Sequence, residues 1–298
     1  MVAANHDLAT HRDGAGRGGG IVLALRSFGD PWGVQLVSQV REDALPKGCS
    51  TLVLTDPLWY EHLLGAEADA ALLTAIDLEP DGPHRVRRLA RRTRSGLVAF
   101  SARMEPEDFD VVSSSPVPAV HRAYSQLRAR HERVHLLAPD RRSWPGGTLA
   151  VPRAAAFLDA VRSHGDGPAE DLVRLTPEGS RGTYESALDW LRGADRPSAV
   201  ICYTGYQAVA LRLAAERAGV RVPEELELLA IGDVPAEAEL LGPISYYGVD
   251  DVFARLSAVV VERAVEHGDR PGRLHCFDWE FFPGTTTDDE TARSPRAC

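Results

Sequence analysis

The sequence predicts an α/β protein built from two doubly wound, parallel sheets. Short apolar runs alternate with amphipathic stretches along most of the chain, and the connections between them are short. This alternation is the pattern of parallel βαβ units. At 298 residues the chain has room for two domains of about 150 residues, or for one domain with two lobes. The number of alternating units is also sufficient for two sheets.

The first half of the chain supplies one set of elements. Residues 21–25 form a continuously apolar run, typical of a buried strand, and Gly29, Asp30 and Pro31 form a turn after it. Valines three residues apart then indicate a helix over 32–45. The other elements expected here are strands at 50–54, 70–76, 96–100, 110–112 and 133–138 and helices at 60–64, 83–94 and 117–130.

The second half repeats the alternation. The expected helices are at 150–164, 183–193, 207–218 and 251–266, and the expected strands are at 172–175, 198–202, 227–231 and 274–282. Gly219 directly follows the third of these helices, where a glycine commonly ends a helix. In doubly wound sheets ligands bind outside the carboxyl ends of the strands, or in a cleft between lobes. We therefore expect a functional site at those ends.

Composition and charge exclude several classes of protein. The chain carries 33 basic and 43 acidic residues, a net charge of −10, whereas a chain that neutralises several phosphates usually carries a basic patch or balance. No apolar run approaches the roughly 20 residues that span a bilayer. Residues 1–20 lack the apolar core of a secretory signal. We expect a cytoplasmic globular protein with a disordered leader at 1–19 and a disordered tail at 287–298.

The common nucleotide, hydrolase and metal motifs are missing. The glycine run at 14–20 precedes the first strand, whereas a dinucleotide-binding loop follows it, and neither a GxxxxGK[ST] loop nor a GxSxG elbow occurs. His131 and His135 are four residues apart, but His135 lies in an apolar run that predicts a strand. The four cysteines form no CxxC pair and are expected to be reduced thiols. No catalytic residue, cofactor or metal is indicated.

Residues 196–286 contain the most informative motifs. These are the run AERAGVRVPEELELLAIGDVP, Pro243 before ISYYGV, and the closing PGTT. In this order and spacing they resemble the effector-binding core of the lactose-repressor/galactose-repressor (LacI/GalR) family of transcription regulators. Weaker similarity over 21–36, 130–137 and 153–161 extends the resemblance to roughly residues 20–286.

The resemblance implies a type I periplasmic-binding-protein-like fold. In that fold two Rossmann-like lobes with parallel sheets are joined by three crossovers, and a ligand binds in the cleft between them. The implied first lobe comprises residues 20–131 plus 247–270, and the implied second lobe comprises residues 132–246 plus 271–286.

Three cleft positions keep features of the family. Arg153 matches the family's ligand-gripping arginine, and the resemblance implies that it binds paired oxygens of the ligand. We expect its removal to change folding little, because an arginine at a helix start adds little to a core. Asp30 and Trp32 match the first-lobe loop, although Asp30 is also a good turn residue before Pro31 and Trp32 also a good staple for the helix start.

Other cleft positions depart from the family. Thr204 and Gly205 replace its Asn-Asp pair, and Gly232 replaces a ligand-facing aspartate and leaves only Asp233. Arg181 stands where the family often has an aromatic residue. It is equally consistent with a surface residue, since 32 of the 33 basic residues are arginine. The candidate ligand-binding residues are Arg153, Asp30, Trp32, Arg181, Thr204, Gly232 and Asp233.

Two functions remain open from the sequence. The first is the small-molecule effector-binding (sensor) domain of a LacI-type regulator, in which lobe closure repacks a first-lobe homodimer formed by the helix after Trp32 and the one around Leu63. The second is a stand-alone protein of this fold that does not bind DNA, either a solute binder or a domain recruited for chemistry in a specialised biosynthetic pathway.

The missing helix-turn-helix and the changed cleft residues indicate which partners to expect. The family's helix-turn-helix does not precede Ile21, so this chain alone is not expected to bind operator DNA, and no membrane partner is expected. Loss of the Asn and Asp positions removes acceptors for sugar hydroxyls, whereas Arg153 and Arg181 could clamp a carboxylate or a phosphate. The candidate ligands are a sugar, a nucleoside, or an organic acid or phosphate.

Overall fold

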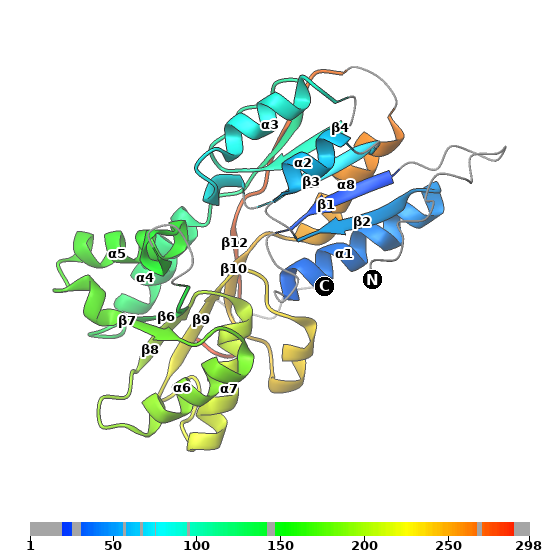
Figure 1. The fold of residues 1–298 in the computed structure, drawn as a ribbon. Coiled ribbons are helices and arrows are strands. Elements are labelled where there is room, and N and C mark those ends of the chain that lie inside the picture. Colours follow the sequence, from blue (N-terminus) through cyan, green and yellow to red (C-terminus); the bar gives the residue numbers. More distant parts are fainter. Residues whose placement is uncertain are drawn as a thin grey trace, which may run out of the picture.

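The computed structural model describes residues 20–25, 31–55, 58–65, 68–74, 76–93, 96–141, 147–266 and 270–288. In this part of the chain two lobes each contain a six-stranded sheet, and helices cover both faces of each sheet (Figure 1). The predicted α/β fold with two lobes is therefore confirmed. The expected leader at 1–19 lies outside the described residues.

The first sheet has the strand order β11-β5-β4-β3-β1-β2, and all its neighbouring strands are parallel. Helices α1 and α8 share a core with one face of this sheet, and α2 and α3 share a core with the other. The strands are β1 (Gly20–Ala24), β2 (Ser50–Leu54), β3 (Ala70–Leu73), β4 (Gly96–Phe100), β5 (Asp110–Ser113) and β11 (Leu274–Cys276). The helices are α1 (Pro31–Ala44), α2 (Trp59–Gly65), α3 (Gly82–Ala90) and α8 (Val252–Val265).

The second sheet has the order β12-β10-β9-β8-β6-β7, in which only β12 is antiparallel to its neighbour. Helices α4 and α5 cover one face, and α6 and α7 cover the other. The strands are β6 (His135–Pro139), β7 (Val173–Thr176), β8 (Ala199–Cys202), β9 (Glu227–Ile231), β10 (Tyr246–Gly248) and β12 (Glu280–Phe282). The helices are α4 (Val117–Arg128), α5 (Pro152–His164), α6 (Ser180–Arg192) and α7 (Gly205–Ala218). Short 3-10 turns are η1 (Leu45–Lys47), η2 (Ile76–Leu78), η3 (Thr148–Ala150), η4 (Ala169–Leu172) and η5 (Ala236–Leu241).

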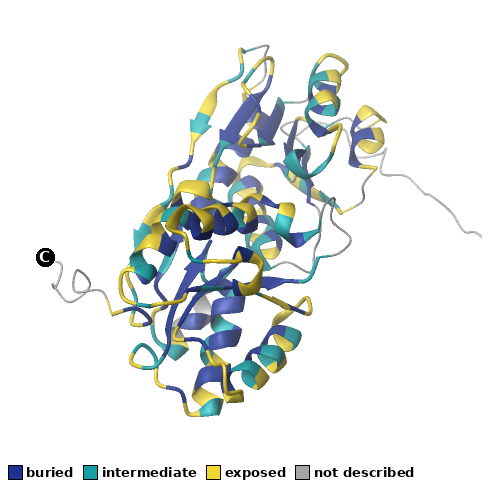
Figure 2. Cartoon of the chain, turned by 90° about the vertical axis from the view of Figure 1, so that its left-hand side faces the viewer, coloured by how far each residue is buried: buried dark blue, intermediate teal, exposed yellow. Residues whose placement is uncertain are grey.

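Burial explains why the central strands are apolar apart from Glu227 at the start of β9. Every residue of β3, β8 and β9 is buried, as expected for parallel strands covered on both faces. Figure 2 shows the strands buried inside each lobe and the outer sides of the helices exposed. The longest described helices have 14 residues, about 21 Å of helix. No helix in the described ranges is long and apolar enough to cross a membrane.

Three segments connect the lobes, and they correct the expected boundaries. Residues 117–131 were expected in the first lobe, but Val120, Tyr124 and Leu127 of α4 lie in a second-lobe core. The single strand expected at 274–282 is two strands, of which β11 pairs with β5 in the first sheet and β12 pairs with β10 in the second. An apolar pattern indicates an extended run, but it does not indicate which sheet edge the run joins.

The chain also differs from expectation at two shorter places. The three-residue strand β10 was not predicted, because it is shorter than the apolar runs that identify a strand. Thr287, expected in the disordered tail, is buried and its Oγ1 lies 2.7 Å from Ser245 Oγ. The described part of the second lobe therefore extends past residue 286.

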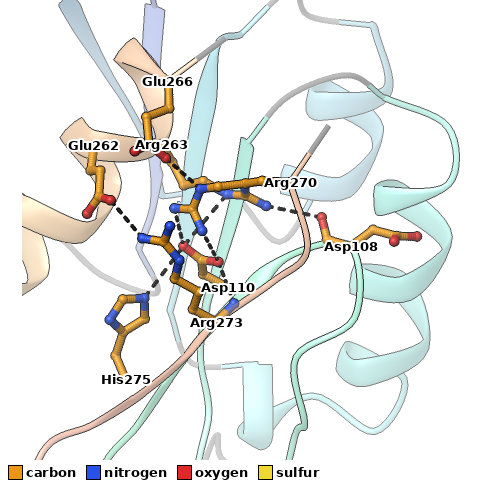
Figure 3. A network of polar contacts seen from close by, with 8 residues as sticks. All are labelled: Asp108, Asp110, Glu262, Arg263, Glu266, Arg270, Arg273 and His275. Carbon is orange, nitrogen blue, oxygen red and sulfur yellow. Dashed lines mark hydrogen bonds and ion pairs between the residues drawn. The ribbon is translucent and has the colours of Figure 1, made fainter. Parts of the chain in front are cut away.

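A buried carboxylate ties together elements next to all three connections (Figure 3). Asp110, fully buried at the start of β5, accepts hydrogen bonds from Arg270 Nη1 (3.2 Å) and Nη2 (3.0 Å) and from the backbone N–H of Arg273 (2.8 Å). Arg263 Nε of α8 lies 3.7 Å from the same carboxylate, and His275 Nε2 of β11 lies 3.6 Å from it. Asp110 thus holds α8 and β11 against β5.

Two exposed carboxylates complete this Asp110 network. Glu262 is 3.0 Å from Arg273, and Glu266 is 2.6 Å from Arg270. Burial lowers the pKa of Arg263, while the charge of Asp110 opposes that effect. The buried guanidinium of Arg263 therefore depends on the negative charge of Asp110 to offset the cost of its burial.

Candidate functional site

The carboxyl ends of β8 and β9 meet the start of α5 at the junction between the lobes. Arg153, in the first turn of α5, reaches across to these strand ends. Tyr203 and Thr204 follow β8, and Gly232 and Asp233 follow β9. In both sheets the strand order reverses beside β1 or β6, which is where doubly wound folds bind ligands.

Arg153 is held by backbone carbonyls and aromatic rings. Its Nη1 donates to the carbonyl oxygens of Tyr203 (2.8 Å) and Ile231 (3.1 Å). Its guanidinium carbon lies 5.3 Å from the ring centroids of both Tyr203 and Trp279, within the range of a cation–π contact. These bonds use both N–H groups of Nη1, and within the described residues Nε and Nη2 have no hydrogen-bond acceptor. Arg153 is thus held by the second lobe and keeps one donor edge unused by the described residues, and these contacts predict a larger effect on folding than the sequence alone suggested.

Gly232 makes room for this guanidinium. Its φ is +104°, a conformation that favours glycine. A Cβ at this position would lie 3.3 Å from both Nη1 and Nη2 of Arg153. The position where the family has a carboxylate is therefore packed against the arginine itself.

Asp233 connects the two lobes. Burial disfavours its carboxylate and raises its pKa to about 6, against the opposing effects of the nearby Arg153 charge and of a hydrogen bond with the Trp32 side chain. Trp32 belongs to α1 of the first lobe, where its ring packs against Phe100 (5.9 Å between centroids) and Phe253 (5.7 Å). Since the indole N–H can only donate, Trp32 donates across the junction to Asp233.

The local structure explains why threonine and glycine stand at positions 204 and 205. Thr204 is the N-cap of α7, and its side chain accepts from the backbone N–H of Gln207 at 3.4 Å. A Cβ on Gly205 would lie 2.2 Å from the carbonyl oxygen of Asp233. The loop after β9 can therefore approach the start of α7 only because residue 205 is glycine.

The remaining two candidates are Arg181 and Asp30. Arg181 lies on α6 with its side chain 91% exposed, and its Nε is 2.9 Å from Glu185 one helical turn away. Asp30 lies outside the described residues. The structure thus brings together Arg153, Gly232, Asp233 and Trp32, with Thr204 beside them.

Sequence reasoning missed two aromatic residues of this site. Tyr203 directly follows a predicted strand, a position from which it could have been identified. Trp279 was hidden inside the single strand expected at 274–282, although it lies in the connection between β11 and β12. Its Nε1 donates to Ser114 Oγ (2.9 Å) in the first connection, and its carbonyl accepts from Arg122 (2.6 Å). Trp279, in the connection between β11 and β12, therefore contacts both the first connection, through Ser114, and helix α4 of the second lobe, through Arg122.

A hollow of about 300 Å³ opens between the lobes, and the residues just before Arg153 in the chain form one of its walls. Its first-lobe wall includes Asp77 and Arg103, and its second-lobe wall is formed by residues 150–152. Asp77 shapes this wall by accepting from Ser101 Oγ (2.5 Å) and from the backbone N–H of Ala102 (2.8 Å). The volume is at the lower end of the range for small-molecule sites.

The two histidines singled out in the sequence have separate surroundings. His131 Nδ1 is 3.0 Å from Ser198 Oγ, and its Nε2 is 3.4 Å from Glu227. His135 begins β6 and packs edge-on against Trp190. No group of three or more His, Cys, Asp or Glu residues in the described ranges is arranged to hold a metal. The three cysteines in these ranges are free thiols.

The raised pKa of Asp233 predicts a pH-dependent stability. Because the folded state holds the proton up to about pH 6, the contribution of Asp233 is fully present below pH 4 and is lost as the pH rises through 6. Each pKa unit corresponds to about 1.4 kcal/mol, so this loss is on the order of 2–3 kcal/mol. Urea unfolding between pH 4 and pH 7 measures it, and the Asp233→Asn protein should lack that part of the profile. Parallel profiles for the two proteins would contradict the prediction.

Comparisons with known proteins agree on the fold. Residues 126–273 match the family of periplasmic binding protein-like domains. Comparison with curated protein sequences finds no match. Among solved structures, an uncharacterized protein from Actinobacillus succinogenes is similar with a TM-score of 0.71 and 14% identity over 91% of this chain and 100% of that one.

Two other similar structures contain sugars. A LacI family transcriptional regulator from Enterococcus faecium with bound ribose has a TM-score of 0.68 and 13% identity, over 90% of this chain and 98% of that one. A LacI family regulator from Lactobacillus casei with bound sucrose has a TM-score of 0.70 and 19% identity, over 90% and 100%. At such identities these similarities establish the fold.

Proposed function

Because the chain has the type I periplasmic-binding-protein-like fold of LacI/GalR effector-binding domains, we propose that it is a small-molecule effector-binding domain of a transcription regulator, with its ligand between the lobes. The observation that carries the proposal is the unused donor edge of Arg153 at the ends of β8 and β9. Nε and Nη2 present two parallel N–H donors to one side, and Asp233 adds a carboxyl group beside them.

The same geometry supports a mechanism of lobe closure. Trp32 and Asp233 come from different lobes, so a ligand that bonds to Arg153 and reaches the first lobe favours the closed arrangement. A ligand shifts such an equilibrium only as far as its affinities for the two states differ. In the proposed regulator this shift is transmitted through a dimer of first lobes.

A thermal-shift panel tests the proposed function. The panel contains ribose, sucrose, nucleosides, organic acids and sugar phosphates, each at concentrations up to about 100 times a plausible Kd, where binding stabilises the fold by about 2.7 kcal/mol. At least one class should raise Tm in proportion to the logarithm of its concentration. The proposal fails if no compound does so, or if Arg153→Lys responds like the wild type to every stabilising compound.

We also propose that the chain forms a homodimer through the first lobe. β2 is an edge strand of the described sheet, and Leu52 on it is 55% exposed, while Leu45 in η1, which precedes β2, is 73% exposed. Exposed edges with apolar side chains favour pairing with another chain. Light scattering at tens of micromolar should give a dimer, and Leu52→Glu should give a monomer.

The matched control for the dimer uses the other lobe. Leu175 lies on β7, the edge strand of the second sheet, and is 40% exposed. Leu175→Glu should therefore leave the dimer intact. A monomeric wild type, or equal dissociation by both substitutions, would count against a first-lobe interface.

A further inference from the structure

A row of cationic side chains lies along the outer side of α3 and is separate from the candidate ligand-binding residues. His84, Arg87, Arg88, Arg91 and Arg92 are the described residues that line a surface hollow of about 460 Å³. Figure 1 places α3 on the first lobe, and Pro83 at its start borders the hollow between the lobes. We refer to these five residues as the α3 cationic row.

The fold does not need these charges. α3 contacts the core through Gly82, Val86 and Leu89, whereas His84 and the exposed arginines of the row point to the opposite side. Residues three and four apart are neighbours on a helix surface, so the pairs within the row repel one another. The row therefore weakens the helix that carries it.

Most of the row lacks a compensating carboxylate. Arg87 lies 2.6 Å from Glu107. Within the described residues His84, Arg88, Arg91 and Arg92 have no ion pair. Exposed arginines elsewhere commonly have one, as in Arg162–Glu170 (2.6 Å), Arg181–Glu185 (2.9 Å) and Arg221–Glu225 (2.9 Å). In a chain with ten more acidic than basic residues, four of the five members of this row thus have no carboxylate partner among the described residues.

We propose that the α3 cationic row is a docking surface for a short acidic segment of a partner protein. α3 rises about 9 Å from His84 to Ala90, and Arg91 and Arg92 follow directly after it, so the row has the length of about four residues of an extended peptide. An extended segment presents every second side chain to the row, so a segment of that length or somewhat longer with several carboxylates can pair with two or more of its members. Charge complementarity selects such a segment, and its binding removes the repulsion along the helix.

Two features favour a short peptide over nucleic acid. None of the described residues that line the hollow is aromatic, so they offer no platform on which a base could stack. The remainder of the chain is strongly acidic, since the whole carries a net charge of −10 including this row. That charge repels a long polyanion, whereas a short segment within a Debye length of the row is attracted to it.

Fluorescence anisotropy with labelled oligoglutamate tests the proposal. The probe is a peptide of about eight glutamates, and the corresponding oligoglutamine peptide reports nonspecific association. The full chain should bind oligoglutamate saturably at low salt and release it as salt rises. The variant Arg88→Ala/Arg91→Ala/Arg92→Ala should bind at least about tenfold more weakly, with an unchanged or higher Tm because the repulsion is gone.

The control removes the same charge from elsewhere. Arg162→Ala/Arg181→Ala/Arg221→Ala has the same net charge as the row variant but takes three exposed arginines from the second lobe. It should bind oligoglutamate within about twofold of the wild type. An equal loss in this control, or no saturable binding by the wild type, overturns the proposal. Tighter binding of a labelled single-stranded or duplex oligonucleotide than of oligoglutamate overturns it in favour of nucleic acid.

Discussion

Replacing Asp110 by alanine should lower the free energy of unfolding by about 3–5 kcal/mol, the cost of removing one partner from a buried ion pair. The substitution leaves Arg270 and the backbone N–H of Arg273 without their acceptor. It also leaves the buried Arg263 without the charge that offsets its desolvation. Urea denaturation followed by circular dichroism measures the loss.

Two further substitutions separate charge from hydrogen bonding at this position. Asp110→Asn keeps one acceptor oxygen, so it should lose less stability than Asp110→Ala. It should still be less stable than the wild type, because the buried arginines lose their counter-charge. Glu107→Ala removes the partner of Arg87 from an exposed pair and should cost less than about 1 kcal/mol. If Asp110→Ala costs no more than Glu107→Ala, the network is not a main support of the first lobe.

Removing the side chain of Arg153 should impair both stability and ligand binding. Arg153→Ala leaves the carbonyls of Tyr203 and Ile231 without a donor, at about 1–3 kcal/mol for each buried group left unpaired. Loss of the donor edge should weaken ligand binding by about 10- to 100-fold, or about 1.5–3 kcal/mol. Affinity is measured well below the Tm of the variant, so that unfolding does not contribute.

Arg181→Ala is the matched control for this substitution. Its exposed pair with Glu185 lies on a helix surface, so its loss should change stability by less than about 0.5 kcal/mol and leave affinity unchanged. An Arg153→Ala protein with wild-type affinity would place the ligand away from Arg153. A protein with wild-type stability would instead contradict the structural role of its two carbonyl bonds.

The parts of the fold that the sequence predicted are those that depend on local pattern. The apolar run of β8 identified a strand buried on both faces, and Gly219 marked the end of α7. The separation of 274–282 into strands of two different sheets depends on β5 and β10, which are distant in sequence. No periodicity within the run itself contains that information.

Residues of the candidate site could be predicted from the sequence, but the contacts between them could not. The sequence identified Arg153 and Asp233 and showed that an aspartate was missing at Gly232. It could not show that the guanidinium occupies the space beside that glycine, because the contact joins the start of α5 to the end of β9. Trp279 could not be predicted for the same reason, since its ring contacts the guanidinium of Arg153 across more than one hundred intervening residues.

The late position of β11 and β12 in the chain has a consequence for synthesis. A nascent chain that has been translated only as far as residue 273 contains neither strand, so the edges of β5 and β10 both have unpaired backbone groups. The same nine residues, 274–282, then close both edges. The two sheets are therefore completed together and late in translation. A ribosome that stalls just before this segment exposes two unpaired strand edges, which can pair with neighbouring nascent chains.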